Sequence, residues 1–289
     1  MSSATKKSNI VIRNIELISE MREVESLQKE VWECDDRDIV PLTLLVATRE
    51  LGAILVGAFE GSLLIGFAYS IVGREDESLV HHSHMLAVRP THRNLNLGYR
   101  LKLAQRDRAI TQGITRMTWT FDPLQSLNAH FNFAKLGVVA DTYKINFYGE
   151  TTSSFLHQIG TDRLWVTWPL ESRRVRERLQ ANNRSRTSNL ERDRIACIVQ
   201  VGPNNVPQRG PSSQVTGQKY TSIEIPADIN TLQRESPELA VRWREATRWA
   251  FTEAIASGYV IKDFWGASRN DQAVGVYLLS AGKRVKDYV

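Results

Sequence analysis

The chain has 289 residues, of which 42% are hydrophobic and 24% charged, as is usual for a globular protein that buries a sizeable core. Its formal net charge of +5 suits an anionic ligand and is too small by itself to indicate nucleic-acid binding. The two cysteines, Cys34 and Cys197, exclude a disulfide framework and match no metal-ligand spacing. A polar N-terminus and short apolar stretches favour a cytoplasmic protein without a membrane segment.

The first part of the chain alternates strand and helix patterns. Short apolar runs predict strands at Val11–Leu17, Ala53–Phe59, Leu63–Val72, Leu79–Val88, Thr115–Phe121, Val138–Tyr148 and Arg163–Trp168. Apolar residues at helical spacing predict helices at Glu20–Trp32, Leu97–Gln112 and Asn128–Lys135. This order predicts an α/β domain over residues 1–170, with helices flanking a mixed, mostly antiparallel sheet.

The composition changes after Leu170. Residues 171–219 are rich first in arginine and then in Gly, Pro, Ser and Gln, which predicts a charged, polar connector. Residues 220–289 predict a small β-α-β-β unit, whose helix is Pro237–Ser257. About seventy residues rarely bury enough apolar surface to be stable alone, so we expect this unit to pack on the first domain.

One turn of the first domain carries the features of a phosphate site. A strand ending at Val88 leads through a short loop into the helix that begins near Leu97. The first N–H groups of a helix lack partners within the helix and carry partial positive charge, so they bind anions. Arg93 adds a full charge, and Gly98 permits a close approach to the backbone.

The segment Arg93-Asn94-Leu95-Asn96-Leu97-Gly98 resembles the pyrophosphate loop of the GNAT acyltransferase superfamily, (Gln/Arg)-x-x-Gly-x-(Gly/Ala). Asn96 replaces the inner glycine, and asparagine is the next most tolerant residue at positive φ. The resemblance implies acetyl-CoA or another acyl-CoA as co-substrate, with pantetheine paired to the open strand edge. The residues that it implies for coenzyme A are Leu86, Ala87, Val88, Arg93, Asn94, Leu95, Asn96, Leu97, Gly98 and Tyr99.

A second segment, Asn128–Val138, is also similar to that superfamily through its Lys-Leu-Gly sequence. The resemblance implies a tyrosine that protonates the departing thiolate, but Phe133 stands at that position. Another group then donates the proton, or the thiolate leaves unaided, or the domain is not catalytic. Asn128 and Asn132 are expected to bind the pantetheine amides; a purely helix-capping role is the alternative.

The catalytic candidates are a base and two polar residues. Strand alternation predicts that His82 and His84 share a face with Leu86 and Val88, opposite His81. Histidine accepts a proton near neutral pH, so His84 is the predicted base and His82 the second choice, with a structural histidine as the alternative. Asp122 is expected to bind a cationic substrate or act as a base, with a turn-forming aspartate as the alternative. Tyr143 or Tyr148 is expected to replace the missing acid, with packing in a strand as the alternative. No third ligand accompanies the histidines at a suitable spacing, so no metal is predicted.

These features predict an acyl-CoA-dependent N-acyltransferase that acts on a small-molecule amine or a peptide by direct transfer in a ternary complex. The alternative is a non-catalytic protein of the same fold that binds a ligand or partner. A nucleic-acid binder using Arg173–Arg194 is disfavoured, because acidic residues interrupt that run and aromatic residues are missing from it. No membrane partner is predicted, and a homodimer stays open.

Overall fold

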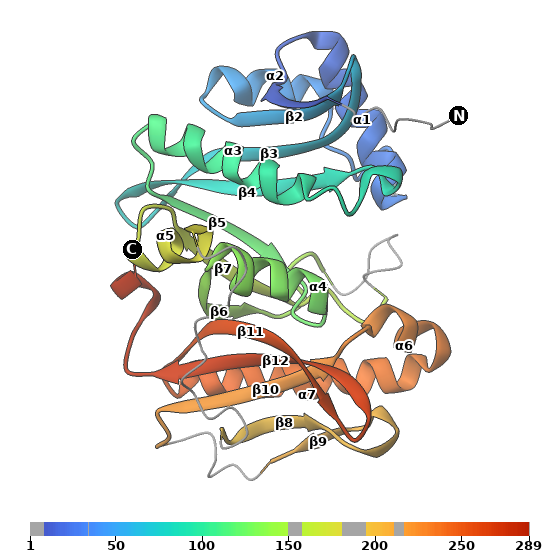
Figure 1. Cartoon of the computed structure of the whole chain (residues 1–289), viewed down its shortest axis with the longest axis vertical. Coiled ribbons are helices and arrows are strands. Elements are labelled where there is room, and N and C mark those ends of the chain that lie inside the picture. The colour runs from blue at the N-terminus through green and yellow to red at the C-terminus, as the bar shows by residue number, and fades with distance from the viewer. Residues whose placement is uncertain (1–8, 34, 150–157, 181–194, 211–216, 289) are drawn as a thin grey trace, which may run out of the picture. The chain divides into compact units, whose positions relative to one another are not determined.

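The computed structural model describes residues 9–33, 35–149, 158–180, 195–210 and 217–288. The chain divides into two compact units, Met1–Thr118 and Trp119–Val289, called unit 1 and unit 2 below (Figure 1). The division between Thr118 and Trp119 falls inside the domain predicted for residues 1–170. The domain limits at residues 170 and 219 are not tested by it and stay predictions. Residues 181–194, which hold much of the arginine-rich run, lie outside the described residues.

Unit 1 is built on a sheet whose first strands are neighbours in sequence. These strands are β1 (Ile10–Asn14), β2 (Ile54–Glu60), β3 (Leu63–Glu75) and β4 (Ser78–Val88), each antiparallel to the next. β4 also pairs in parallel with the start of β5 (Arg116–Phe121), through His81↔Met117 and His82↔Thr118. The predicted mixed, mostly antiparallel sheet is therefore confirmed.

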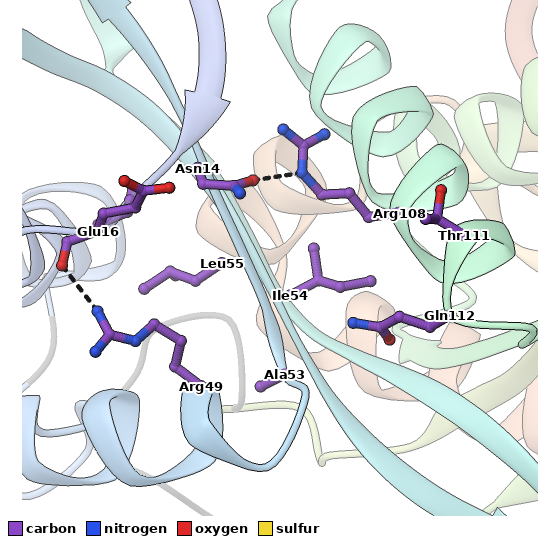
Figure 2. Close-up of a pocket in the computed structure, with 10 residues that line it drawn as sticks. Asn14, Glu16, Arg49, Ala53, Ile54, Leu55, Arg108, Thr111 and Gln112 are labelled. Atoms are coloured by element: carbon purple, nitrogen blue, oxygen red, sulfur yellow. Dashed lines mark hydrogen bonds between the residues drawn. The ribbon is translucent and has the colours of Figure 1, made fainter.

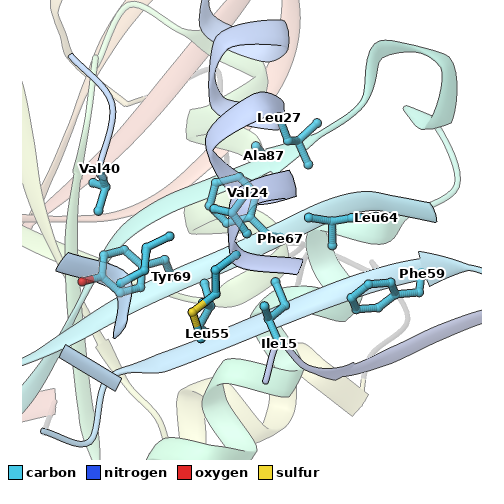
Figure 3. Packing of buried hydrophobic residues seen from close by; sticks show 12 residues of the cluster. Ile15, Val24, Leu27, Val40, Leu55, Phe59, Leu64, Phe67, Tyr69 and Ala87 are labelled. Carbon is cyan, nitrogen blue, oxygen red and sulfur yellow. The ribbon is translucent and has the colours of Figure 1, made fainter. Parts of the chain in front are cut away.

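Helices cover both faces of this sheet. α1 (Ile18–Trp32) and α2 (Leu42–Glu50) pack on the face that carries Phe67 and Tyr69, where a buried apolar cluster forms (Figure 3). α3 (Leu97–Thr111) covers the other face, where its Leu101 side chain lies against Gly66 of β3. The sequence did not predict α2, whose apolar residues run together instead of recurring at helical spacing.

The face of β4 changes along the strand because β4 contains a bulge. Tyr69 pairs with Met85 and Ser70 with Ser83, so His84 is the extra residue. The ring of His84 packs edge-on against Tyr69, and Met85 also packs on the cluster of that face. Leu86 and Val88 instead lie on the α3 face. The prediction that His82 and His84 share a face with Leu86 and Val88 was therefore wrong, since simple alternation does not allow for an extra residue.

Unit 2 contains a sheet in the order β7-β6-β11-β12-β10-β8-β9. Its strands are β6 (Val139–Lys144), β7 (Arg163–Pro169), β8 (Cys197–Val201), β9 (Pro207–Arg209), β10 (Tyr220–Pro226), β11 (Tyr259–Arg269) and β12 (Gln272–Ala281). Its helices are α4 (Ser126–Ala129), the π-helix η2 (His130–Leu136), α5 (Arg173–Gln180), α6 (Ile229–Glu235) and α7 (Pro237–Ala256). Thus α5, β8 and β9 lie in the stretch predicted as a connector. No described helix is long and apolar enough to span a bilayer.

Two hairpins of unit 2 meet at their edges. The β6–β7 hairpin and the β11–β12 hairpin are joined where Ala140 pairs with Ile261. Each hairpin follows a helix, η2 in the first case and α7 in the second. The C-terminal β-α-β-β prediction gave the three strands and α7 but missed the short helix α6, so the order is β10-α6-α7-β11-β12, and these strands extend the sheet that begins with β7 and β6.

Buried ion pairs fasten α7 to the segment that follows β5. Both guanidinium nitrogens of Arg244 donate to the carboxylate of Asp122, at 2.9 and 2.6 Å. Arg244 is only 2% exposed and Asp122 8%. One turn further along α7, Arg248 donates to the buried carboxylate of Asp162. These charged hydrogen bonds hold the C-terminal residues to residues 119–170.

Replacing Arg244 by alanine is expected to lower the free energy of unfolding by about 3–5 kcal/mol, because the carboxylate of Asp122 is left buried without its charge partner. Urea unfolding measures this effect. Arg173→Ala is the control, since the side chain of Arg173 is 87% exposed and the substitution is expected to leave the midpoint unchanged. Equal midpoints for Arg244→Ala and the wild-type protein would contradict the prediction.

A chain ending at Leu170 is expected to be poorly soluble or to melt at a lower temperature than the full chain. It loses the partners of Asp122 and Asp162 and exposes apolar surface now covered by α7. Thermal melting and sedimentation of the two proteins test this. An undiminished melting temperature would mean that the C-terminal residues are an independent appendage.

Candidate functional site

The turn between β4 and α3 is shaped by two asparagines. After a short 3₁₀ turn at Pro90–His92, Asn94 has φ of 72° and Asn96 has φ of 56°. This left-handed region is strained for most side chains, and asparagine is among those that tolerate it best. Asn96 thus occupies the position of the expected glycine and adopts a backbone conformation that favours glycine.

The first turn of α3 is open to an anion. Asn96 is the N-cap residue of α3, and its side chain makes no capping hydrogen bond. Arg93 is exposed beside this turn, and its guanidinium has no hydrogen bond or ion pair with the residues that the structure describes. Uncapped N–H groups at the positive end of a helix dipole, next to an unengaged guanidinium, favour a phosphate group.

The strand that leads into this turn has one edge unpaired within unit 1. On one side, Leu86, Ala87 and Val88 pair with Ala68, Phe67 and Gly66 of β3. On the other side, the described pairs of unit 1 reach only His81 and His82. Unit 1 therefore brings together all the residues predicted from Leu86 to Tyr99.

The three histidines of β4 have different surroundings. His81 is completely buried; its Nε2 lies 2.6 Å from Gln112 Oε1 and its Nδ1 3.2 Å from Ser70 Oγ. Burial lowers the pKa of His81, which keeps the ring neutral at ordinary pH. With both ring nitrogens in hydrogen bonds inside the core, His81 has a structural role.

His82 and His84 lie on the same face as Tyr69. His82 is half-buried, with Nδ1 3.1 Å from the hydroxyl of Thr118, and burial, together with the nearby His84 and Lys102, lowers its pKa to about 4. His84 is exposed, yet the protein around its ring removes enough water to lower its pKa below the ordinary value. Both imidazoles are therefore neutral at pH 7, as a base must be, and His84 is the more accessible.

A buried lysine close to these histidines was not expected from the sequence. Lys102 of α3 is 2% exposed, and its Nζ donates a 2.6 Å hydrogen bond to Ser83 Oγ, which in turn donates to Gln105 Oε1 at 3.0 Å. Burial lowers the pKa of Lys102 well below its ordinary value. Lys102 does not stand out in the sequence, because α3 contains several other basic residues. What distinguishes Lys102 is that it lies on the buried face of α3.

The catalytic candidates of unit 2 are held in internal contacts. Asp122 accepts both hydrogen bonds from Arg244 and one from the backbone of Leu124. Tyr143 donates to Asp162, and burial followed by the Asp162 charge raises the pKa of Tyr143 well above its ordinary value. Asp122 is occupied by the bidentate contact with Arg244, and a tyrosine of raised pKa is a weak acid, so these contacts favour structural roles.

The helix that precedes β6 places the remaining candidates of unit 2. Phe133 is completely buried in the π-helix, with its ring against Phe121 and Tyr277. Asn132 is 3% exposed and accepts a hydrogen bond from the indole of Trp119, whereas Asn128 is exposed. Asn132 thus has an internal partner, and Asn128 is available to solvent.

A pocket of about 540 Å³ lies at the other end of unit 1, beside the last turn of α3 (Figure 2). Arg108 reaches Asn14 on one side, and Arg49 donates to the backbone carbonyl of Glu16 on the other. It is lined by Asn14, Ile15, Glu16, Arg49, Ala53, Ile54, Leu55, Arg108, Thr111 and Gln112. The α3 N-terminus is about 20 Å away along the helix, so this pocket is separate from the turn described above.

Comparisons with known proteins agree with the predicted family. The family model described as "Acetyltransferase (GNAT) family" matches residues 15–138. No curated protein matches the chain by sequence.

Three similar solved structures are acetyltransferases. The ribosomal-protein-S18-alanine N-acetyltransferase of Escherichia coli is 14% identical, with a TM-score of 0.45, covering 56% of this chain and 94% of that chain. The PaiA N-acetyltransferase of Thermoplasma acidophilum, in complex with coenzyme A, is 17% identical, with a TM-score of 0.40, covering 56% and 99%. Naa50 of Arabidopsis thaliana, with a bisubstrate analogue, is 11% identical, with a TM-score of 0.43, covering 55% and 97%. Residues 15–138, which make up less than half of the chain, are thus similar to the acetyltransferase (GNAT) family.

Proposed function

We propose that the protein transfers an acyl group, most simply acetyl, from coenzyme A to the amine of a small molecule or peptide. The observation that carries this proposal is the turn between β4 and α3. There, two left-handed asparagines lead into a helix start that no described side chain caps, with Arg93 exposed beside it. In the proposal, this turn holds the pyrophosphate, and the backbone of Leu86–Val88 pairs with pantetheine.

The chemistry is a direct attack of the acceptor amine on the thioester carbonyl. The C–N bond forms and the C–S bond breaks, so coenzyme A leaves as a thiolate. His84 takes the proton that the amine nitrogen loses, because its imidazole is neutral and exposed. The thiolate then takes a proton from water, since Phe133 has none to give and Tyr143 is already bonded to Asp162.

A second candidate is a non-catalytic protein of the same fold that binds coenzyme A or a partner. The observation that favours it is the buried aromatic packing of Phe133, at the position where the family resemblance implies an acid. Acetyl-CoA titration by calorimetry, followed by turnover assays with a panel of amines and peptides, separates the two. Binding without turnover of any acceptor would favour the second candidate.

Replacing Arg93 by alanine is expected to weaken coenzyme A binding by about 1.5–3 kcal/mol, the cost of one charge-assisted hydrogen bond. Isothermal titration calorimetry with coenzyme A measures the change in Kd. Arg49→Ala is the matched control, because it removes the same charge at the far pocket of unit 1. An unchanged Kd for coenzyme A in Arg93→Ala would contradict the proposal that this turn binds the pyrophosphate.

The rate of acyl transfer is expected to fall as the pH drops through the pKa of His84, which lies below the ordinary histidine value. A protonated imidazole accepts no proton, so activity is full above that pKa and is lost below it. His84→Ala is expected to lower kcat and to abolish this acid limb in a pH–rate profile. If His84→Ala keeps both the wild-type kcat and the acid limb of the pH–rate profile, His84 is not the base, and His82 or water takes that role.

A further inference from the structure

The buried lysine of α3 sits beside the strand that carries the proposed base. Its ammonium group has lost almost all contact with water, which is costly for a charge unless other interactions offset the cost. An apolar side chain at position 102 would avoid that cost. We therefore look for the role of Lys102 in the hydrogen bond that its amino group makes with Ser83.

Ser83 is the link between Lys102 and the bulge. Lys102 and Gln105 lie three residues apart on one face of α3, and both bond to the hydroxyl of Ser83. Ser83 is the last residue of β4 before the extra residue His84. On the other side of the bulge, Ala87 is buried in the apolar cluster. The bulge is thus held at both ends, by α3 before it and by the core after it.

We propose that Lys102 is a positioning residue for acyl transfer: through Ser83 it fixes the bulge at His84, and with it the places of the His82 and His84 imidazoles. This inference rests on the proposed function. Without the contact to Ser83, β4 has less to prevent a one-residue slip, and such a slip moves side chains to the opposite face. The imidazoles would then lose their common face beside Tyr69.

The charge of Lys102 has a second effect on the same site. Within unit 1, both His84 of its own strand and Lys102 of α3 act on the charge of His82. Its partners on the neighbouring strands, Ile71 and Thr118, are uncharged. Both titratable neighbours oppose protonation, as does burial, which is the largest cause of the lowered pKa of His82.

The first test follows the histidine imidazoles of the full chain by NMR during a pH titration. In Lys102→Met, the midpoint of His82 is expected to rise from about 4 toward the ordinary histidine value, because a positive charge is removed. Arg108→Met, which removes a charge further along α3, is the control and is expected to leave that midpoint unchanged. A folded Lys102→Met protein with an unchanged His82 midpoint and an unchanged contact between the rings of His84 and Tyr69 overturns the proposal.

The second test does not depend on the folding of Lys102→Met. Ser83→Ala keeps the lysine and removes its contact with β4. The nuclear Overhauser effect between the rings of His84 and Tyr69 is expected to weaken, and kcat to fall about tenfold with the KM for acetyl-CoA unchanged. An unchanged ring contact and an unchanged kcat overturn the proposal. If the NMR changes occur in a chain that acylates no acceptor, the positioning role stands and the proposed acyl transfer is wrong.

Discussion

The register of β4 is the constraint on which unit 1 depends. Before the bulge, Ser83 faces α3 and His82 faces the opposite side; after it, Met85 packs on the apolar cluster and Leu86 returns to α3. Because of the extra residue, β4 presents His82 and His84 on one face, while Leu86 and Val88 pack on the α3 face. This register also sets where the strand ends and the turn begins. After the turn, Lys102 and Gln105 of α3 bond to Ser83.

Most elements of the fold could be predicted from the sequence, because their patterns are local. Alternating apolar runs gave β2, β3 and β4 to within a few residues, and helical spacing gave α1, α3 and α7. α2 was missed because only Leu45 of its nine residues is buried, so it has little periodic signal. β8 and β9 were missed because they are short and lie within a polar stretch.

The candidate site was less predictable, since its geometry depends on contacts between distant segments. The position of Asn96 at a left-handed φ followed from the intrinsic tolerance of asparagine, and that expectation agrees with the structure. The faces of His82 and His84 depend on a bulge, which has no signature in the side-chain pattern of β4. Likewise, nothing near Asp122 in sequence indicates Arg244, which lies 122 residues further along the chain. The predicted binding and catalytic roles themselves stay predictions.

The pairing of β6 with β11 has a consequence for how the molecule avoids unwanted association. An uncovered strand edge offers unpaired N–H and C=O groups, onto which a strand of another chain can add. The chain covers the edge of β6 with its own C-terminal hairpin, and the sheet continues from there to β9. β9 is three residues long and begins with Pro207, which has no N–H to donate. Among the described residues, this end of the sheet therefore offers an incoming strand few backbone groups to pair with.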